Sequence, residues 1–130
     1  MASRAPDWFA QAERDMEQAV SSRDEGRHEW ACFAAHQAAE KAVKALDLAL
    51  GQEAWGHAVA RLLLELPVSA LDGLVEKGKV LDNHHVPTCY ANGHPEGAPF
   101  EHCGPLQSEE TIRYAGEIVG FVRDEMARVG

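Results

Sequence analysis

The chain has 130 residues, of which 45% are hydrophobic and 25% are charged. These values are typical of one ordinary globular domain, which we place at residues 1–130. The formal net charge of −9 argues against general nucleic-acid binding, which requires a basic surface. We expect no signal peptide, because residues 1–9 contain no apolar run preceded by positive charge. We also expect no membrane span, because the longest apolar run is only 30–35. The three cysteines are irregularly spaced, which indicates reduced thiols in a cytoplasmic protein.

Before residue 26, apolar residues at helical spacing predict a first helix over 6–21. Its expected buried stripe consists of Trp8, Ala12, Met16, Ala19 and Val20.

The strongest helical pattern follows, over residues 28–50. Its alanines recur at spacings of three and four, which places them on one face of a long helix. A bulkier apolar stripe lies beside them, with His36 as its one polar member, so the pattern predicts a wide buried arc. Glu40, Lys44 and Asp47 fall on the opposite side, where Glu40 and Lys44 form an i,i+4 pair.

After Gly51, which fits the end of the long helix, two shorter helices are expected. One covers 57–66 and the other runs from a cap at Ser69 to 81–83. Gly78 should weaken the second of them by about 1 kcal/mol relative to alanine.

The stretch from His84 to Leu106 contains four prolines and three glycines, and no helical or strand period survives in it. It is predicted to be a long loop, and long loops in small domains are usually functional. Ser108 is then expected to cap the last helix. The core stripe of this helix should contain Ile112, Ala115, Val119, Val122 and Met126. A second ridge, about 100° away round the helix, contains Tyr114, Ile118 and Phe121.

These patterns predict an all-α fold, an up-and-down bundle of four to five helices with a long Pro/Gly-rich loop before the last helix. A single bundle core is not expected to cover both ridges of that helix. The second ridge therefore predicts a homodimer with a two-fold contact.

Several segments resemble one family. The run over 28–42, HEWACFAAHQAAEKA, resembles the second helix of HEPN domains (higher eukaryotes and prokaryotes nucleotide-binding). His57 with the leucine pair after it is similar to the family's third helix, and 86–90 is similar to its aromatic-Pro-Thr-Arg-Tyr-Pro segment. Cys89 stands where arginine is common, and Ala91 where proline is common. The chain is similar to the prokaryotic single-domain members and to the C-terminal domain of sacsin.

The resemblance implies a dimerising helical domain that is a nucleotide-binding module, a partner of a minimal nucleotidyltransferase, or a metal-independent RNase of a toxin–antitoxin system. The RNase members carry an arginine and, a few residues later, a histidine near the end of the domain. Here Arg113 has no histidine after it, and only Arg23 and His28 have this spacing. We therefore expect a binding module without catalytic residues or a cofactor. The alternative is an RNase in which Arg23 and His28 stabilise charge and transfer protons.

The long loop is the predicted ligand site. Its imidazoles, hydroxyl and aromatic ring suit contacts to a phosphate and a base. The expected ligand-binding residues are His84, His85, Thr88 and Tyr90.

The same loop is also rich in zinc-binding residue types, which leaves a zinc-stabilised structural domain as a third hypothesis. The alternative metal ligands are His85, Cys89, His94 and His102. Their spacing fits no familiar zinc pattern, so we expect no metal. We expect His36 and His57 to be buried or half-buried and hydrogen-bonded within the fold.

Overall fold

The computed structural model describes residues 3–69, 72–84 and 95–129. Within these ranges the chain is all-α, as predicted, with five α-helices and one short 3-10 helix. The elements are α1 (Ala5–Asp24), α2 (His28–Ala49), α3 (Val59–Leu64), α4 (Asp72–Asp82), η2 (Pro99–Glu101) and α5 (Pro105–Val129). None of the described helices is long and apolar enough to cross a membrane.

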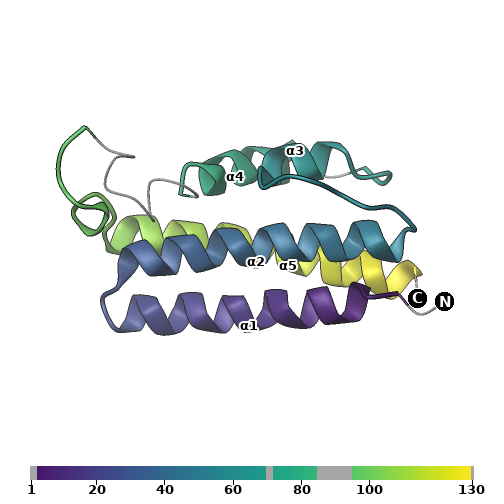
Figure 1. Cartoon of the computed structure of the whole chain (residues 1–130), viewed down its shortest axis with the longest axis horizontal. Helices are drawn as coiled ribbons and strands as arrows, with labels where there is room; N and C mark the ends of the chain where they lie inside the picture. Colours follow the sequence, from purple (N-terminus) through teal and green to yellow (C-terminus); the bar gives the residue numbers. More distant parts are fainter. Residues whose placement is uncertain (1–2, 70–71, 85–94, 130) are drawn as a thin grey trace.

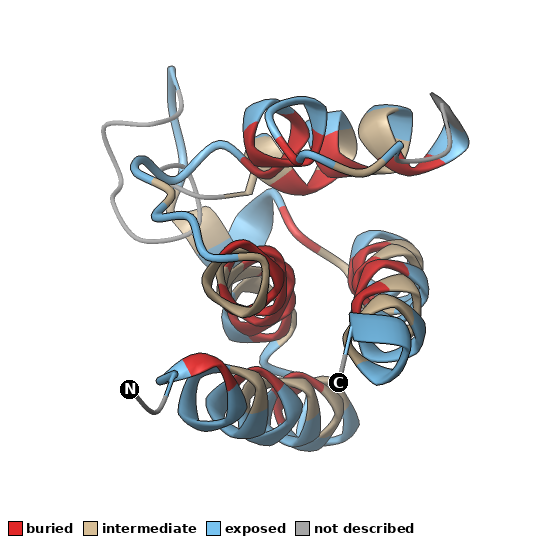
Figure 2. Cartoon of the chain, turned by 90° about the vertical axis from the view of Figure 1, so that its right-hand side faces the viewer, coloured by how far each residue is buried: buried red, intermediate tan, exposed pale blue. Residues whose placement is uncertain are grey.

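The bundle is organised around α2 (Figures 1 and 2). α1 and α5 pack against it, and α3 and α4 form a layer over a further side. α2 and α5 begin at the same end of the bundle, and α1 runs in the opposite direction (Figure 1). This central position explains the wide buried arc of α2. Its fully buried alanines are Ala31, Ala35, Ala38, Ala39, Ala42 and Ala45.

The outer helix α1 buries less than its pattern predicted. Ala12 and Ala19 are fully buried, but the Trp8 side chain is 38% exposed. Because α1 lies at the edge of the bundle (Figure 2), only one narrow face meets α2 and α5. The prediction that Trp8 belongs to the buried stripe was therefore wrong.

The expected polar face of α2 is also partly buried. Glu40 forms the predicted pair with Lys44, whose Nζ donates to it at 3.1 Å, yet the Glu40 residue is only 5% exposed. His57 Nδ1, in the segment before α3, donates to the same carboxylate at 3.2 Å. His57 is hydrogen-bonded as expected, but its side chain is 66% exposed rather than buried. Asp47 is likewise buried, at 4% exposed, because the chain after α2 folds back over this face.

Asp82, at the end of α4, ties three helices together. One carboxylate oxygen accepts from Val59 N–H at 2.6 Å, and the other accepts from Ala60 N–H at 3.1 Å. Both amides belong to the first turn of α3, where backbone N–H groups have no partner inside the helix. The fully buried His36 of α2, predicted to be buried and hydrogen-bonded, donates from Nε2 at 3.1 Å. Asp82 therefore caps α3 and fixes it to α2.

Gly78 has a packing role that its helix propensity does not reveal. A Cβ at this position would lie 3.0 Å from the Ala60 backbone nitrogen and 3.1 Å from its Cα. α3 and α4 thus approach each other closely enough to require glycine here.

Replacing Gly78 with alanine is expected to lower the free energy of unfolding by about 1 kcal/mol, because overpacking outweighs the gain in helix propensity. Urea denaturation measures this. Gly73→Ala is the matched control, since it lies in the same helix with nothing within 4 Å of the added Cβ. An equal or higher stability for Gly78→Ala than for wild type would contradict the close approach.

The last helix begins earlier than predicted. Pro105 lies at its first position, where the fixed φ of proline suits a helix start. Ser108 is therefore inside α5 and fully buried, and its hydroxyl donates to the Pro105 carbonyl at 3.2 Å. The prediction that Ser108 caps the helix was wrong.

The second ridge of α5 is not exposed as expected. Ile118 is fully buried, and Tyr114 and Phe121 are half-buried. The reason is that α5 packs against α1, α2 and α4 at once, so its buried arc is wider than one stripe. The homodimer was predicted from an exposed second ridge, and Ile118, in the middle of that ridge, is not available for such a contact.

Candidate functional site

Most of the predicted ligand loop lies outside the described residues. This applies to His85, Thr88, Cys89, Tyr90 and His94. His84 is described: it is half-buried just after α4, and its imidazole is hydrogen-bonded to the Cys32 thiol. His102 is exposed, and its Nε2 donates to the Glu96 carbonyl. The predicted roles of these loop residues as nucleotide ligands or zinc ligands therefore stay predictions.

His84 belongs to a cluster that sequence reasoning did not find. The sulfur atoms of Cys32 and Cys103, both buried and free, lie 2.9 Å apart. The possible ligand atoms of Cys32, His84 and Cys103 all lie within 4.8 Å of one another. Thr111 Oγ1 of α5 donates to the Cys32 sulfur at 3.4 Å, and the Cys103 sulfur lies 3.3 Å from the His28 carbonyl oxygen.

The two thiols differ in acidity because they share a hydrogen bond. The Cys32 sulfur shares a hydrogen bond with the Cys103 thiol, which lowers the pKa of Cys32 although burial opposes this; hydrogen bonds with His84 and Thr111 lower it further. The same hydrogen bond, together with burial, raises the pKa of Cys103. Of the two thiols, Cys32 therefore loses its proton more easily.

The arginine and histidine of the RNase alternative have separate partners. Arg23 Nε, near the end of α1, donates to Asp24 at 3.2 Å. The His28 imidazole, at the start of α2, is hydrogen-bonded to the Ser108 hydroxyl at 2.8 Å through Nδ1. The structure therefore gives His28 a place in the packing of α2 against α5.

A groove of about 470 Å³ lies between α1 and α2. Its aromatic wall is Trp30, 50% exposed, with its ring edge-on to Phe33 at a centroid distance of 6.2 Å. Lys41 Nζ donates to Asp15 at 2.6 Å within it. The remaining lining residues are Gln18, Ser22, Arg27, Ala34 and Gln37.

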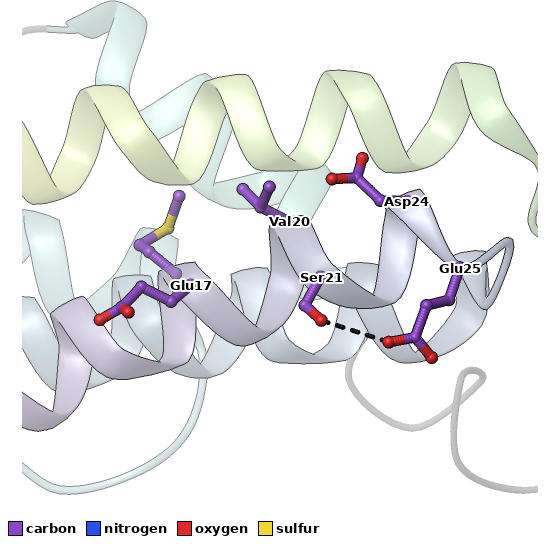
Figure 3. A pocket seen from close by; sticks show the side chains of 6 residues that line it. Glu17, Val20, Ser21, Asp24 and Glu25 are labelled. Carbon is purple, nitrogen blue, oxygen red and sulfur yellow. Dashed lines mark hydrogen bonds between the residues drawn. The ribbon is translucent and has the colours of Figure 1, made fainter.

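A second groove, of about 610 Å³, lies on α1 beside α5 (Figure 3). Its carboxylates come from Glu17, Asp24 and Glu25, and the Ser21 hydroxyl donates to Glu25 at 3.4 Å. Val20 and Met16 form its apolar floor. Three carboxylates create a negative field that disfavours phosphate. Although larger, this groove is a poorer candidate than the groove between α1 and α2 for an anionic ligand.

The fold defines an all-helical bundle domain centred on one alanine-rich helix. The family model described as HEPN domain matches residues 5–125. The chain therefore belongs to the HEPN domain family, which confirms the resemblance of its motifs; the similarity to sacsin stays a prediction. No curated protein matches the chain.

Three solved structures support this assignment. TT1696 from Thermus thermophilus is 44% identical over 95% of this chain and 99% of its own, with a TM-score of 0.93. ST0689, an archaeal HEPN homologue, is 34% identical over 96% of this chain and 99% of its own, with a TM-score of 0.83. A HEPN domain protein from Thermotoga maritima is 33% identical over 94% of this chain and 98% of its own, with a TM-score of 0.78.

Proposed function

We propose that this HEPN protein is a non-catalytic module that binds a nucleotide in the groove between α1 and α2. The observation that carries the proposal is the half-exposed Trp30 ring, which borders a groove lined by amide, hydroxyl and cationic groups. An exposed aromatic face beside hydrogen-bonding side chains suits a stacked nucleobase. The name of the family, which refers to nucleotide binding, agrees with this chemistry.

The groove offers different side chains to the base and to the phosphate of a nucleotide. Gln18 and Gln37 offer amide groups that can pair with the polar edge of a base stacked on Trp30. Arg27 lies at the turn between the helices; its side chain is 68% exposed, and its Nε is 3.9 Å from Glu25. Such a loose surface ion pair contributes little, so a phosphate competes for Arg27 easily. Lys41 is already neutralised by Asp15.

Nucleotide binding is expected to depend on Trp30. Titration calorimetry of AMP and ATP should show binding to wild type, and Trp30→Ala should weaken it about tenfold or more, because stacking on an aromatic ring contributes ~1–3 kcal/mol per base. Trp55→Ala is the control, since Trp55 is 81% exposed and lies outside this groove. Arg27→Ala should weaken binding of ATP but not of adenosine. If no nucleotide binds wild type at millimolar concentration, the proposal is wrong.

The RNase alternative predicts a different result. An RNase needs an arginine and a histidine converging on one phosphate, whereas Arg23 and His28 contact Asp24 and Ser108. We therefore expect purified protein to leave single-stranded RNA and tRNA intact in the presence of a chelator. Cleavage that disappears in Arg23→Ala or His28→Ala would replace the binding module by the RNase.

We further propose that the module acts as a homodimer in the cytoplasm, beside a minimal nucleotidyltransferase. The family resemblance supports this assembly. Exposed apolar side chains near the start of α5 also support it, with Phe100 at 64% and Leu106 at 75% exposed. Sedimentation equilibrium tests the dimer, and a monomer at micromolar concentration would contradict it. Co-purification with a nucleotidyltransferase encoded by a neighbouring gene tests the pairing.

A further inference from the structure

We propose that Cys32, His84 and Cys103 bind one zinc ion, with water in the fourth coordination position. Two thiolates and one imidazole are donors that zinc prefers, and three protein ligands plus a water complete a tetrahedron. Among the residues that the structure describes, these three form the group of His, Cys and carboxylate side chains whose ligand atoms converge. The site is independent of the proposed nucleotide groove, because none of the three residues lines that groove.

The donors come from three separate parts of the fold. Cys32 lies in the first turns of α2, His84 directly follows α4, and Cys103 lies between η2 and α5. Cys32 is 0% and Cys103 7% exposed, while His84 is half-buried. The sulfurs are thus shielded from solvent, and the imidazole lies at the side nearer the surface.

Small adjustments bring the cluster to coordination geometry. Tetrahedral zinc with Zn–S bonds of about 2.3 Å separates two thiolate sulfurs by roughly 3.8 Å, whereas these sulfurs are 2.9 Å apart. The two side chains must therefore open by about 0.9 Å, which is within the reach of a small χ1 rotation. The proton that Cys103 shares with Cys32 leaves to solvent, as does any proton on Cys32, and the imidazole coordinates as the neutral ring.

Zinc accounts for the cluster better than a disulfide does. A disulfide uses two sulfurs and an oxidant, and it gives no role to the imidazole that is hydrogen-bonded to Cys32. Two thiolates and Zn²⁺ together are electrically neutral, which removes most of the penalty of burying charge. The bound ion would cross-link α2 to the end of α4 and to the start of α5, and would hold both ends of the connection between α4 and α5.

Cobalt and zinc binding to the whole chain test the proposal. Reduced, metal-free protein titrated with Co²⁺ should develop thiolate-to-cobalt charge-transfer bands and the d–d spectrum of a tetrahedral ion, with one ion bound per chain. Zn²⁺ should displace the cobalt and raise the melting temperature. Cys32→Ser, Cys103→Ser and His84→Ala should each weaken metal binding by at least about tenfold, as loss of a ligand does.

Two control variants and a folding measurement make the result decisive. His102→Ala and Cys89→Ser should keep the cobalt spectrum of wild type. Circular dichroism of each metal-free variant shows whether it folds, and His84→Ala, whose side chain is only half-buried, is the variant expected to fold while losing the metal. The proposal is overturned if wild type binds no Co²⁺ or Zn²⁺ at micromolar concentration. It is also overturned if Cys89→Ser abolishes the spectrum, or if the sulfurs form a disulfide that leaves metal uptake unchanged.

Discussion

Replacing Asp82 with alanine is expected to lower the free energy of unfolding by about 3 kcal/mol. The carboxylate accepts two N–H groups of the first turn of α3 and the Nε2 proton of the fully buried His36. Hydrogen bonds to a charged group contribute about 1.5–3 kcal/mol, and a buried donor left without a partner adds a penalty of about 1–3 kcal/mol. Urea denaturation followed by circular dichroism measures the loss.

The effect should be concentrated in α3. Hydrogen exchange at the Val59 and Ala60 amides should speed up in Asp82→Ala more than exchange in the centre of α2. Asp82→Asn should retain part of the stability, because the amide oxygen still accepts one N–H. Asp124→Ala is the matched control, since Asp124 is an exposed aspartate in a helix. A loss for Asp82→Ala no larger than that for Asp124→Ala would contradict the capping role.

The sequence specified the helices well because their signals are local. The alanine period of α2 predicts His28–Ala49 to within one residue, since the spacing of apolar residues alone identifies a helical face. The start of α5 was missed because two local signals compete. Ser108 is a good cap, but Pro105 three residues earlier is a good first residue, and proline begins the helix.

The burial of two carboxylates of α2 could not be predicted from the sequence. Glu40 and Asp47 occupy the polar side of the α2 pattern, and they become buried when a segment later in the chain folds over them. Such burial depends on tertiary packing, which has no periodic signature. The capping of α3 by Asp82 likewise has no local signal. Asp82 is separated by 23 and 22 positions from the two residues whose N–H groups it accepts, which is beyond the range of any capping motif.

The candidate sites show the same difference between local signals, which the sequence contains, and tertiary contacts, which it does not reveal. The sequence pointed to the imidazoles and thiols of the loop, and it included His84 among the ligand residues. It did not pair His84 with Cys32, because Cys32 reads as one more member of an apolar helix stripe. Cys32 and Cys103 are 71 positions apart, so no spacing rule could join them. The groove at Trp30 was missed because an aromatic residue in an apolar run indicates burial, whereas this ring is half exposed.

Replacing Asp47 with asparagine is expected to stabilise the protein near neutral pH and to have little effect in acid. Burial, with a smaller contribution from the charge of Glu65, raises the pKa of Asp47 from 3.8 to about 6. The folded state therefore binds this proton more tightly than the unfolded state. The stability that this tighter proton binding adds is complete at pH values below the pKa of Asp47 in the unfolded chain. It is lost as the pH rises through about 6. Above that pH the folded wild type carries a buried negative charge on Asp47, which is 4% exposed. The asparagine variant carries no charge at this position.

Unfolding in urea over a pH series measures this difference. At about pH 8, Asp47→Asn should be more stable than wild type by about 3 kcal/mol, because the pKa of Asp47 rises from 3.8 to about 6 on folding and a tenfold change in an ionisation constant corresponds to ~1.4 kcal/mol. At about pH 4 the free energies of unfolding of Asp47→Asn and wild type should be nearly equal. In a Glu65→Gln background, the stability difference between Asp47→Asn and Asp47 at high pH should be smaller. The substitution removes the repulsion between the Glu65 and Asp47 carboxylates but leaves Asp47 buried. Asp124→Asn should show no such divergence. If the stabilities of Asp47→Asn and wild type stay parallel between about pH 4 and pH 8, Asp47 titrates normally and its burial carries no electrostatic penalty.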